Sequence, residues 1–156
     1  MPGDKGLARL RTLFFGRRGT PSPADAWLAR RAKATPAEVI REHFAAMVAH
    51  DLDWILATLA PERARLYNEH RTIDKRRLTI ATATVASAEP ATATIPLPGF
   101  AHRYRSTLVL RVEFDLELVD QEKRRDPTVH QGRDWSYYIL VTEGRGKSWL
   151  IADWGK

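Results

Sequence analysis

The spacing of hydrophobic and polar positions changes once along the chain, near residue 71. Before this point apolar residues recur every three to four positions, as in Ile40, Phe44, Met47 and Val48. This is the spacing of one apolar face of a helix. After it apolar and polar residues alternate and β-branched residues become common, which is typical of strands with one buried face. Helices followed by strands predict an α+β domain.

The helices of the first half are predicted from their starts. Ser22–Asp25 and Thr35–Glu38 each place a hydroxyl before a proline and a carboxylate three residues further on. These side chains satisfy backbone donors that a helix start leaves open. The first motif predicts a helix from 23 to about 33, and the second predicts the main core helix. Asp51 caps a short helical segment, and a further helix is expected over residues 61–68.

The clearest strand covers residues 104–119. Its even positions from Leu108 to Leu118 are apolar and its odd positions are mostly charged, so a shift of one residue would bury those charges. The other expected strands cover 78–88, 92–95, 135–142 and 148–154. The last two are joined by a glycine-containing hairpin loop, residues 143–147.

Positive charge is concentrated at the N-terminus. Residues 1–33 hold eight Lys and Arg against two Asp, whereas the remaining chain holds 17 basic and 17 acidic residues. The net charge of +6 therefore belongs to the N-terminal arm. We divide the chain into a basic arm, residues 1–34, and a single α+β domain, residues 35–156, since 156 residues fit one domain.

Composition excludes several classes of protein. Without cysteine, the chain has neither a disulfide framework nor a thiolate metal site or nucleophile. It has no run of about 20 apolar residues that could span a membrane. The apolar run from Leu7 to Phe15 is broken by Arg9 and Arg11, so we expect no cleaved signal peptide. The expected location is cytoplasmic, with the arm able to lie on a membrane surface.

Few patterns carry recognisable chemistry. The five histidines lack metal-ligand spacing, and no glycine-rich nucleotide loop is present. Glu113, Asp115 and Glu117 alternate along a strand, where we expect them to pair across the sheet with Arg105, Arg111 and other bases. The domain has two basic runs, Lys75–Arg77 and Lys123–Arg125, and neither is interleaved with aromatic residues. We therefore expect no specific binding of nucleic acid. We therefore predict no catalytic residue, no metal and no cofactor.

Five residues are candidates for ligand binding. His70 lies where helices give way to strands, and Asp153 stands between Ile151 and Trp154, where it should be partly buried. Three tyrosines combine an apolar ring with a polar tip and could line a cavity. The candidate site residues are Tyr67, His70, Tyr104, Tyr138 and Asp153.

Two stretches resemble the nuclear transport factor 2-like (cystatin-like) superfamily over about residues 35–155, closest to small bacterial domains of unknown function. At the start these are Thr35–Ile40, Phe44, His50–Asp53 and Pro61–Glu62, and at the end Tyr137–Val141 and Trp149–Gly155. The resemblance implies a cone, in which a curved antiparallel sheet of four to six strands wraps around the helices. It also implies a pocket at the wide end. Some of the similar bacterial domains are lipoproteins, but this chain lacks their lipobox cysteine.

The resemblance leaves two functional hypotheses open, because the superfamily contains isomerases, dehydratases, cyclases and many non-enzymes. The first is a non-catalytic module that binds a small ligand or a protein. The second is a pocket enzyme that uses His70, Asp153 and a tyrosine as acid–base groups. The expected partners are a small apolar ligand or a protein, a second copy bound through the sheet, and an anionic membrane contacted by residues 5–18.

Overall fold

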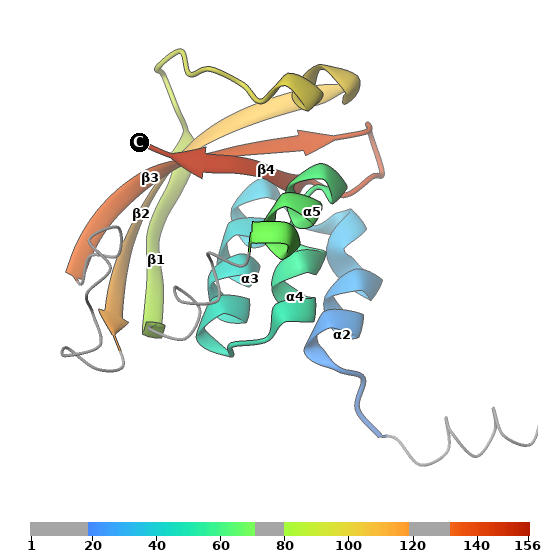
Figure 1. The fold of residues 1–156 in the computed structure, drawn as a ribbon, viewed down its shortest axis with the longest axis vertical. Helices are drawn as coiled ribbons and strands as arrows, with labels where there is room; N and C mark the ends of the chain where they lie inside the picture. The colour runs from blue at the N-terminus through green and yellow to red at the C-terminus, as the bar shows by residue number, and fades with distance from the viewer. Residues whose placement is uncertain (1–18, 71–79, 119–131) are drawn as a thin grey trace, which may run out of the picture.

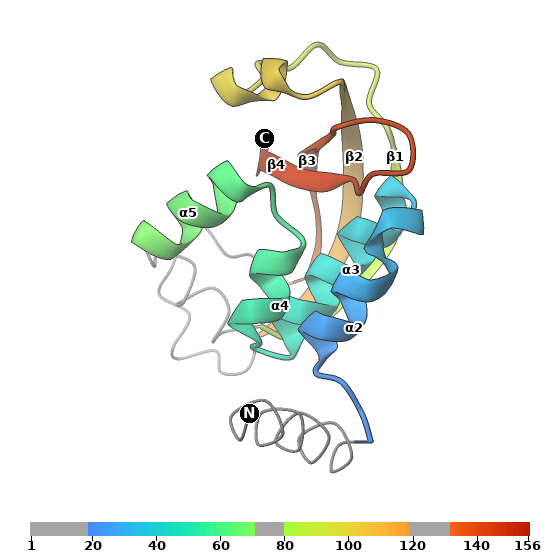
Figure 2. The ribbon, with the colours of Figure 1, turned by 90° about the vertical axis from the view of Figure 1, so that its right-hand side faces the viewer.

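The helices of the chain form one layer against an antiparallel sheet. The computed structural model describes residues 19–70, 80–118 and 132–156, except for the side chain of His70. Figure 1 shows the sheet bending around α3 (Pro36–Val48), and Figure 2 shows this helix together with α2 (Pro23–Arg30) and α4 (Leu52–Ala57) on one side of the sheet. This arrangement confirms the predicted α+β class. The elements in chain order are α2 (Pro23–Arg30), η1 (Arg31–Lys33), α3 (Pro36–Val48), α4 (Leu52–Ala57), α5 (Pro61–His70), β1 (Ile80–Pro90), η2 (Gly99–Arg103), β2 (Ser106–Leu118), β3 (Gly132–Thr142) and β4 (Leu150–Gly155).

The predicted helix caps are present. The Thr35 hydroxyl accepts a hydrogen bond from the Glu38 amide, and the Glu38 carboxylate accepts one from the Thr35 amide. Ser22 and Asp51 cap α2 and α4 through their own side-chain oxygens. Beyond the end of α3, His50 adopts a left-handed backbone with φ 55°, and its ring Nε2 lies 2.8 Å from the carbonyl oxygen of Ile80. The end of α3 is thereby fixed to the start of β1.

The sheet has the strand order β1-β2-β3-β4, with all neighbours antiparallel. In β2 the even residues Leu110, Val112 and Phe114 are buried, as the alternation predicts. On the other face Arg111 donates to Glu113 at 2.5 Å, and this hydrogen bond holds the pKa of the Glu113 carboxyl below its usual value. Asp115 pairs across the sheet with Arg133 of β3, with 3.3 Å between Oδ2 and Nε, whereas the Arg111–Glu113 pair lies within β2 and Glu117 accepts from Thr82. Among the described contacts the expected pairing across the sheet is therefore confirmed for Asp115 alone.

The predicted short strand at 92–95 is wrong. Residues 91–98 are irregular, and the ladder of β1 ends at Pro90. Prolines at 90, 96 and 98 remove the backbone donors that a paired strand would need. The segment instead leads into η2, where Ala101 and Phe100 pack against Ile139 of β3 in a second, smaller apolar cluster.

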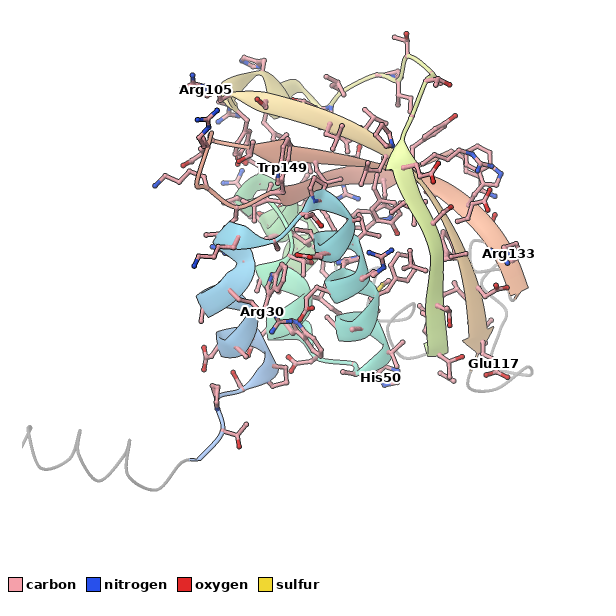
Figure 3. All side chains as sticks on the ribbon, turned by 180° about the vertical axis from the view of Figure 1, so that it is seen from behind. Arg30, His50, Arg105, Glu117, Arg133 and Trp149 are labelled. Atoms are coloured by element: carbon pink, nitrogen blue, oxygen red, sulfur yellow. The ribbon has the colours of Figure 1, made fainter. Side chains whose placement is uncertain are left out.

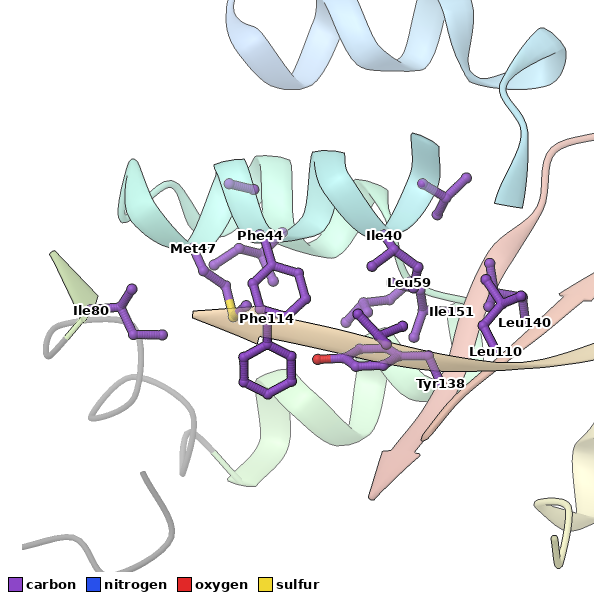
Figure 4. Packing of buried hydrophobic residues seen from close by; sticks show 14 of the residues in the cluster. Ile40, Phe44, Met47, Leu59, Ile80, Leu110, Phe114, Tyr138, Leu140 and Ile151 are labelled. Carbon is purple, nitrogen blue, oxygen red and sulfur yellow. The ribbon is translucent and has the colours of Figure 1, made fainter. Parts of the chain in front are cut away.

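The main core lies between α3 and the inner face of the sheet. Phe44 of α3 packs against Phe114 of β2, with ring centroids 5.1 Å apart, and against Tyr138 of β3 at 6.0 Å (Figure 4). Ile40 and Met47 of the same helix belong to this cluster. Because burial of apolar side chains is the dominant favourable term in folding, α3 is the main helix against which the sheet packs.

The helix at 23–30 is also part of this layer. Trp27 of α2 is 2% exposed and joins the main core. Arg30 pairs with Glu42 of α3 at 2.5 Å, and Arg31 donates to the carbonyl of Ala57 at 2.9 Å. These contacts place η1, the short turn after α2, beside the sheet end that carries the β3–β4 loop.

Candidate functional site: a basic groove

Four of the five predicted site residues are connected to helix α5. Tyr67 lies within α5 and is buried, and His70 is its last residue. The Tyr104 hydroxyl donates to the carboxylate of Glu62, whose oxygens lie 2.6 and 2.9 Å away. Asp153 forms an ion pair with Arg63, with 3.4 Å between Oδ1 and Nη2. These contacts hold α5 against β4 and the segment before β2.

The remaining candidate, Tyr138, is a core residue. Its ring stacks on Trp154 with centroids 6.1 Å apart, and the Arg63 guanidinium lies 4.4 Å from the centre of the same indole. Asp153 and Tyr138 are therefore linked through Arg63 and Trp154. None of the five residues lines either of the two pockets described below.

Tyr104 shows how strongly these contacts perturb a side chain. Burial, and then the hydrogen bond to Glu62, raise the pKa of the Tyr104 phenol well above its usual value. The neutral phenol is the form that can donate to a carboxylate. The Tyr104 phenol therefore stays protonated and holds α5 in place by donating a hydrogen bond to Glu62.

A groove of about 370 Å³ lies between η1, the start of β2 and the β3–β4 loop. Its volume falls within the usual range for small-ligand pockets, roughly 300–1,000 Å³. Figure 3 shows Arg105 at the tip of the sheet and Trp149 between that tip and the helices. The residues lining this basic groove are Ala32, Lys33, Ala34, Arg105, Ser106, Thr142, Gly144, Arg145, Gly146, Lys147 and Trp149.

The lining carries four positive charges and no carboxylate. Lys33, Arg105, Arg145 and Lys147 are exposed, and the side chain of none of them forms an ion pair or hydrogen bond with another described residue. The nearest acidic neighbour in sequence, Glu143, is exposed and lies outside the lining. A hollow lined by one sign of charge concentrates ions of the other sign. The groove is therefore suited to an anion.

The loop that carries two of these cations is built around Thr142. Its buried hydroxyl accepts from the Gly144 amide at 3.3 Å and lies within hydrogen-bonding distance of two loop carbonyls. The Lys147 amide closes the turn by donating to the Gly144 carbonyl at 3.0 Å. Gly144 and Gly146 have φ of 143° and 77°, backbone conformations that favour glycine. Arg145 and Lys147 project from this compact turn.

The other two cations come from distant parts of the chain. The Arg105 amide donates to the Thr142 carbonyl at 3.0 Å, so the start of β2 lies directly beside the loop. Lys33 is the last residue of η1, which docks through the Arg31 contact with Ala57 and through Trp27 of the preceding helix. The pairing of β2 with β3 and the docking of η1 therefore bring the residues of the groove together.

A second pocket of about 360 Å³ adjoins the groove and shares Lys33 and Ala34 with it. Its lining is mixed in charge, because Glu38 and Glu42 accompany the bases. Glu42 pairs with Arg30 and also accepts from the indole of Trp54 at 3.2 Å. The cations there are partly neutralised, so the basic groove is the better candidate for an anion site.

Sequence reasoning missed this groove because it interpreted residues 143–147 only as a hairpin loop. The available signal was the series Arg145, Lys147 and Trp149, which places two cations and an indole at alternate positions.

The described residues lack two kinds of feature, a metal-ligand cluster and a membrane-spanning helix. They contain no group of three or more His, Cys, Asp or Glu that could hold a metal ion. They also contain no helix that is both long and apolar enough to cross a membrane.

The described residues form an α+β domain with a groove lined by four basic residues at one end of its sheet. The chain belongs to DUF4829, a family of domains of unknown function, whose profile matches residues 37–155. Of the residues that line the groove, Ala32, Lys33 and Ala34 precede the matched range, and the others lie within it.

One solved structure is similar to this chain. It is the solution structure of RPA3114, a SEC-C motif containing protein from Rhodopseudomonas palustris. It shares 18% identity, with 83% of this chain and 85% of that chain covered, and has a TM-score of 0.49. No curated protein matches this chain significantly in sequence.

Proposed function

We propose that this domain is a non-catalytic binding module that holds an anionic ligand in the basic groove. The observation that carries the proposal is the convergence of Lys33, Arg105, Arg145 and Lys147 in one groove without a carboxylate. Exposed cations usually find acidic partners or spread apart, because like charges repel. Here they stay together, and an anion would relieve the repulsion between them.

The two arginines and two lysines suit an oxyanion in complementary ways. A guanidinium presents a planar fork that matches carboxylate and phosphate oxygens, whereas an ammonium acts as a compact point charge. Exposed charge pairs contribute up to about 1 kcal/mol each. Four of them give about 4 kcal/mol, which corresponds to a dissociation constant on the order of 1 mM. A multiply charged oxyanion at low salt is therefore the appropriate first probe.

Calorimetric titration with pyrophosphate at low ionic strength tests the proposal. We expect a dissociation constant on the order of 1 mM, weakened at least about tenfold by the double variant Arg105→Ala/Arg145→Ala. The matched control is Arg65→Ala/Arg133→Ala, which also removes two charges from exposed arginines, one on α5 and one on β3. Equal weakening by both double variants would mean that pyrophosphate responds only to net charge, and the proposal would fall.

We also infer that the domain is of the nuclear transport factor 2-like kind. The support is the sequence resemblance together with a curved antiparallel sheet that wraps around α3. An experimental structure with a closed cone over α3 would agree with the inference, and a flat sheet with α3 displaced would contradict it.

The other expectations about function stay predictions. The alternative of a pocket enzyme gains no support from the described contacts, because Asp153 pairs with Arg63 and Tyr104 donates to Glu62. The charge of the groove favours an anion over the expected small apolar ligand. The arm at 5–18, with its expected membrane contact, lies outside the described residues. Co-sedimentation with anionic liposomes, with and without the arm, tests that contact.

A further inference from the structure

Trp149 forms part of the basic groove although it is a large aromatic residue among cations. It is half-buried, and it packs against the main core while also lining the groove. Figure 3 shows it on the helix-facing side of the sheet tip. The groove therefore has an aromatic wall beside its charged rim.

No cation or aromatic ring among the described residues stacks on the ring of Trp149, which in this respect resembles Trp54 and differs from the other three tryptophans. Trp27 has Arg30 over its ring, Trp135 has Arg111, and Trp154 has Arg63. No cation or aromatic ring among the described residues contacts Trp149 in this way, although four cations line the same groove. An indole ring that lines a groove without a stacking partner can accept one from a ligand.

The charge of the groove limits the ligand further. Four cations that form no ion pair with another described residue line this groove of about 370 Å³, so a dianion neutralises half of their charge and a monoanion only a quarter. The favourable ligand carries at least two negative charges close together. A diphosphate meets this requirement with several oxyanions on one short chain, each able to accept from an arginine fork.

We propose that the ligand of the groove is a small polyanion with a planar aromatic part, such as a nucleoside diphosphate. Its oxyanions would bind Arg105, Arg145, Lys147 and Lys33, and its aromatic part would stack on Trp149. The inference rests on the proposed function, since it adds an aromatic subsite to the same anion site. It departs from the expectation of an apolar ligand, because the charged end dominates recognition.

The experiment compares ADP with pyrophosphate, which offers two linked phosphates without a base or ribose. Stacking of a base on an aromatic side chain is worth about 1–3 kcal/mol, so ADP should bind about 5- to 150-fold more tightly than pyrophosphate. Trp149→Leu should remove this advantage, so that the ratio of the ADP and pyrophosphate affinities falls to about one. The matched control is Trp135→Leu, a half-buried tryptophan outside the groove, which should leave both affinities unchanged.

The outcomes separate this inference from the proposed function. Equal affinities for ADP and pyrophosphate, both weakened by Arg105→Ala, would overturn the aromatic subsite and leave the anion site standing. Absence of binding by both probes at about 10 mM, well above the expected dissociation constant, would overturn the anion site itself.

A short oligoadenylate should bind more weakly than ADP because it offers one charge per phosphate. Tighter oligoadenylate binding would overturn the assignment to a small molecule.

Discussion

Arg105 lies across Gly144 so closely that a Cβ atom on Gly144 would stand 3.2 Å from Cδ of Arg105. The two residues are far apart in sequence, and they meet because the start of β2 pairs with the end of β3. The glycine leaves space for the arginine stem, and the stem directs its guanidinium toward the groove rim. Because of this contact, a substitution at Gly144 should affect both the stability of the fold and the binding of an anion.

Gly144→Ala should reduce both properties. A side chain at φ 143° is strained, which costs about 1–3 kcal/mol, and the added methyl group displaces the Arg105 stem. Gly132→Ala is the matched control, since its φ of 92° also disfavours a side chain, no atom lies within 4 Å of the new Cβ, and Gly132 lies outside the groove. Urea unfolding should show a loss for both variants, whereas pyrophosphate binding should weaken only for Gly144→Ala. Equal binding by the two variants would contradict the role of the contact.

Trp27→Ala should lower the free energy of unfolding and weaken the docking of α2, and with it the position of η1 beside the groove. Replacing a buried tryptophan by alanine costs about 3–5 kcal/mol. Leu28, its neighbour in α2, is 47% exposed, so Leu28→Ala should change the free energy of unfolding by less than about 0.5 kcal/mol. Urea unfolding measures both values. If the two variants lose the same stability, α2 does not dock through Trp27.

The hydrogen bond from Tyr104 to Glu62 predicts a dependence on alkaline pH. The pKa of the phenol is raised in the folded state, so its contribution to stability is complete below about pH 10, the pKa of an unperturbed tyrosine. It decreases as pH rises further, because the unfolded chain then releases the proton more readily. The difference in unfolding free energy between the native chain and Tyr104→Phe should therefore shrink from about pH 10 to about pH 11.

Glu62→Gln serves as the control for this dependence. A carboxamide still accepts the hydrogen bond but adds no negative charge beside the phenol. The decline with pH should be smaller in the Glu62→Gln background, measured again against Tyr104→Phe. A difference that grows with pH in the native chain would contradict the assigned direction.

Local chemistry explains why much of the fold could be predicted. Thr35 and Glu38 specify a helix start through their own side chains, and β2 specifies its register through alternation over 13 residues. The short strand at 92–95 failed because β-branched composition outweighed the prolines around it. β3 begins at Gly132, before the predicted start at 135, because Gly132, Arg133 and Asp134 pair with β2. Such pairing between strands cannot be seen within one segment.

The groove could not be predicted because its parts are distant in sequence. Lys33, Arg105 and Lys147 meet only after α2 has docked and β2 has paired with β3. The predicted site residues were chosen for partial burial and polar tips, and Tyr104 and Asp153 do have polar partners. Those partners lie on α5, and their orientation toward the sheet is a tertiary property.

A titration of the ¹⁵N-labelled chain with pyrophosphate, followed by amide chemical shifts, tests the central claim most directly. We predict saturable shifts concentrated at the residues that line the groove, which are 32–34, 105–106, 142, 144–147 and 149. Arg105→Ala/Arg145→Ala should suppress them. Shifts centred instead on Tyr67 and Asp153, or spread evenly over exposed bases, would contradict the assignment of the basic groove as the ligand site.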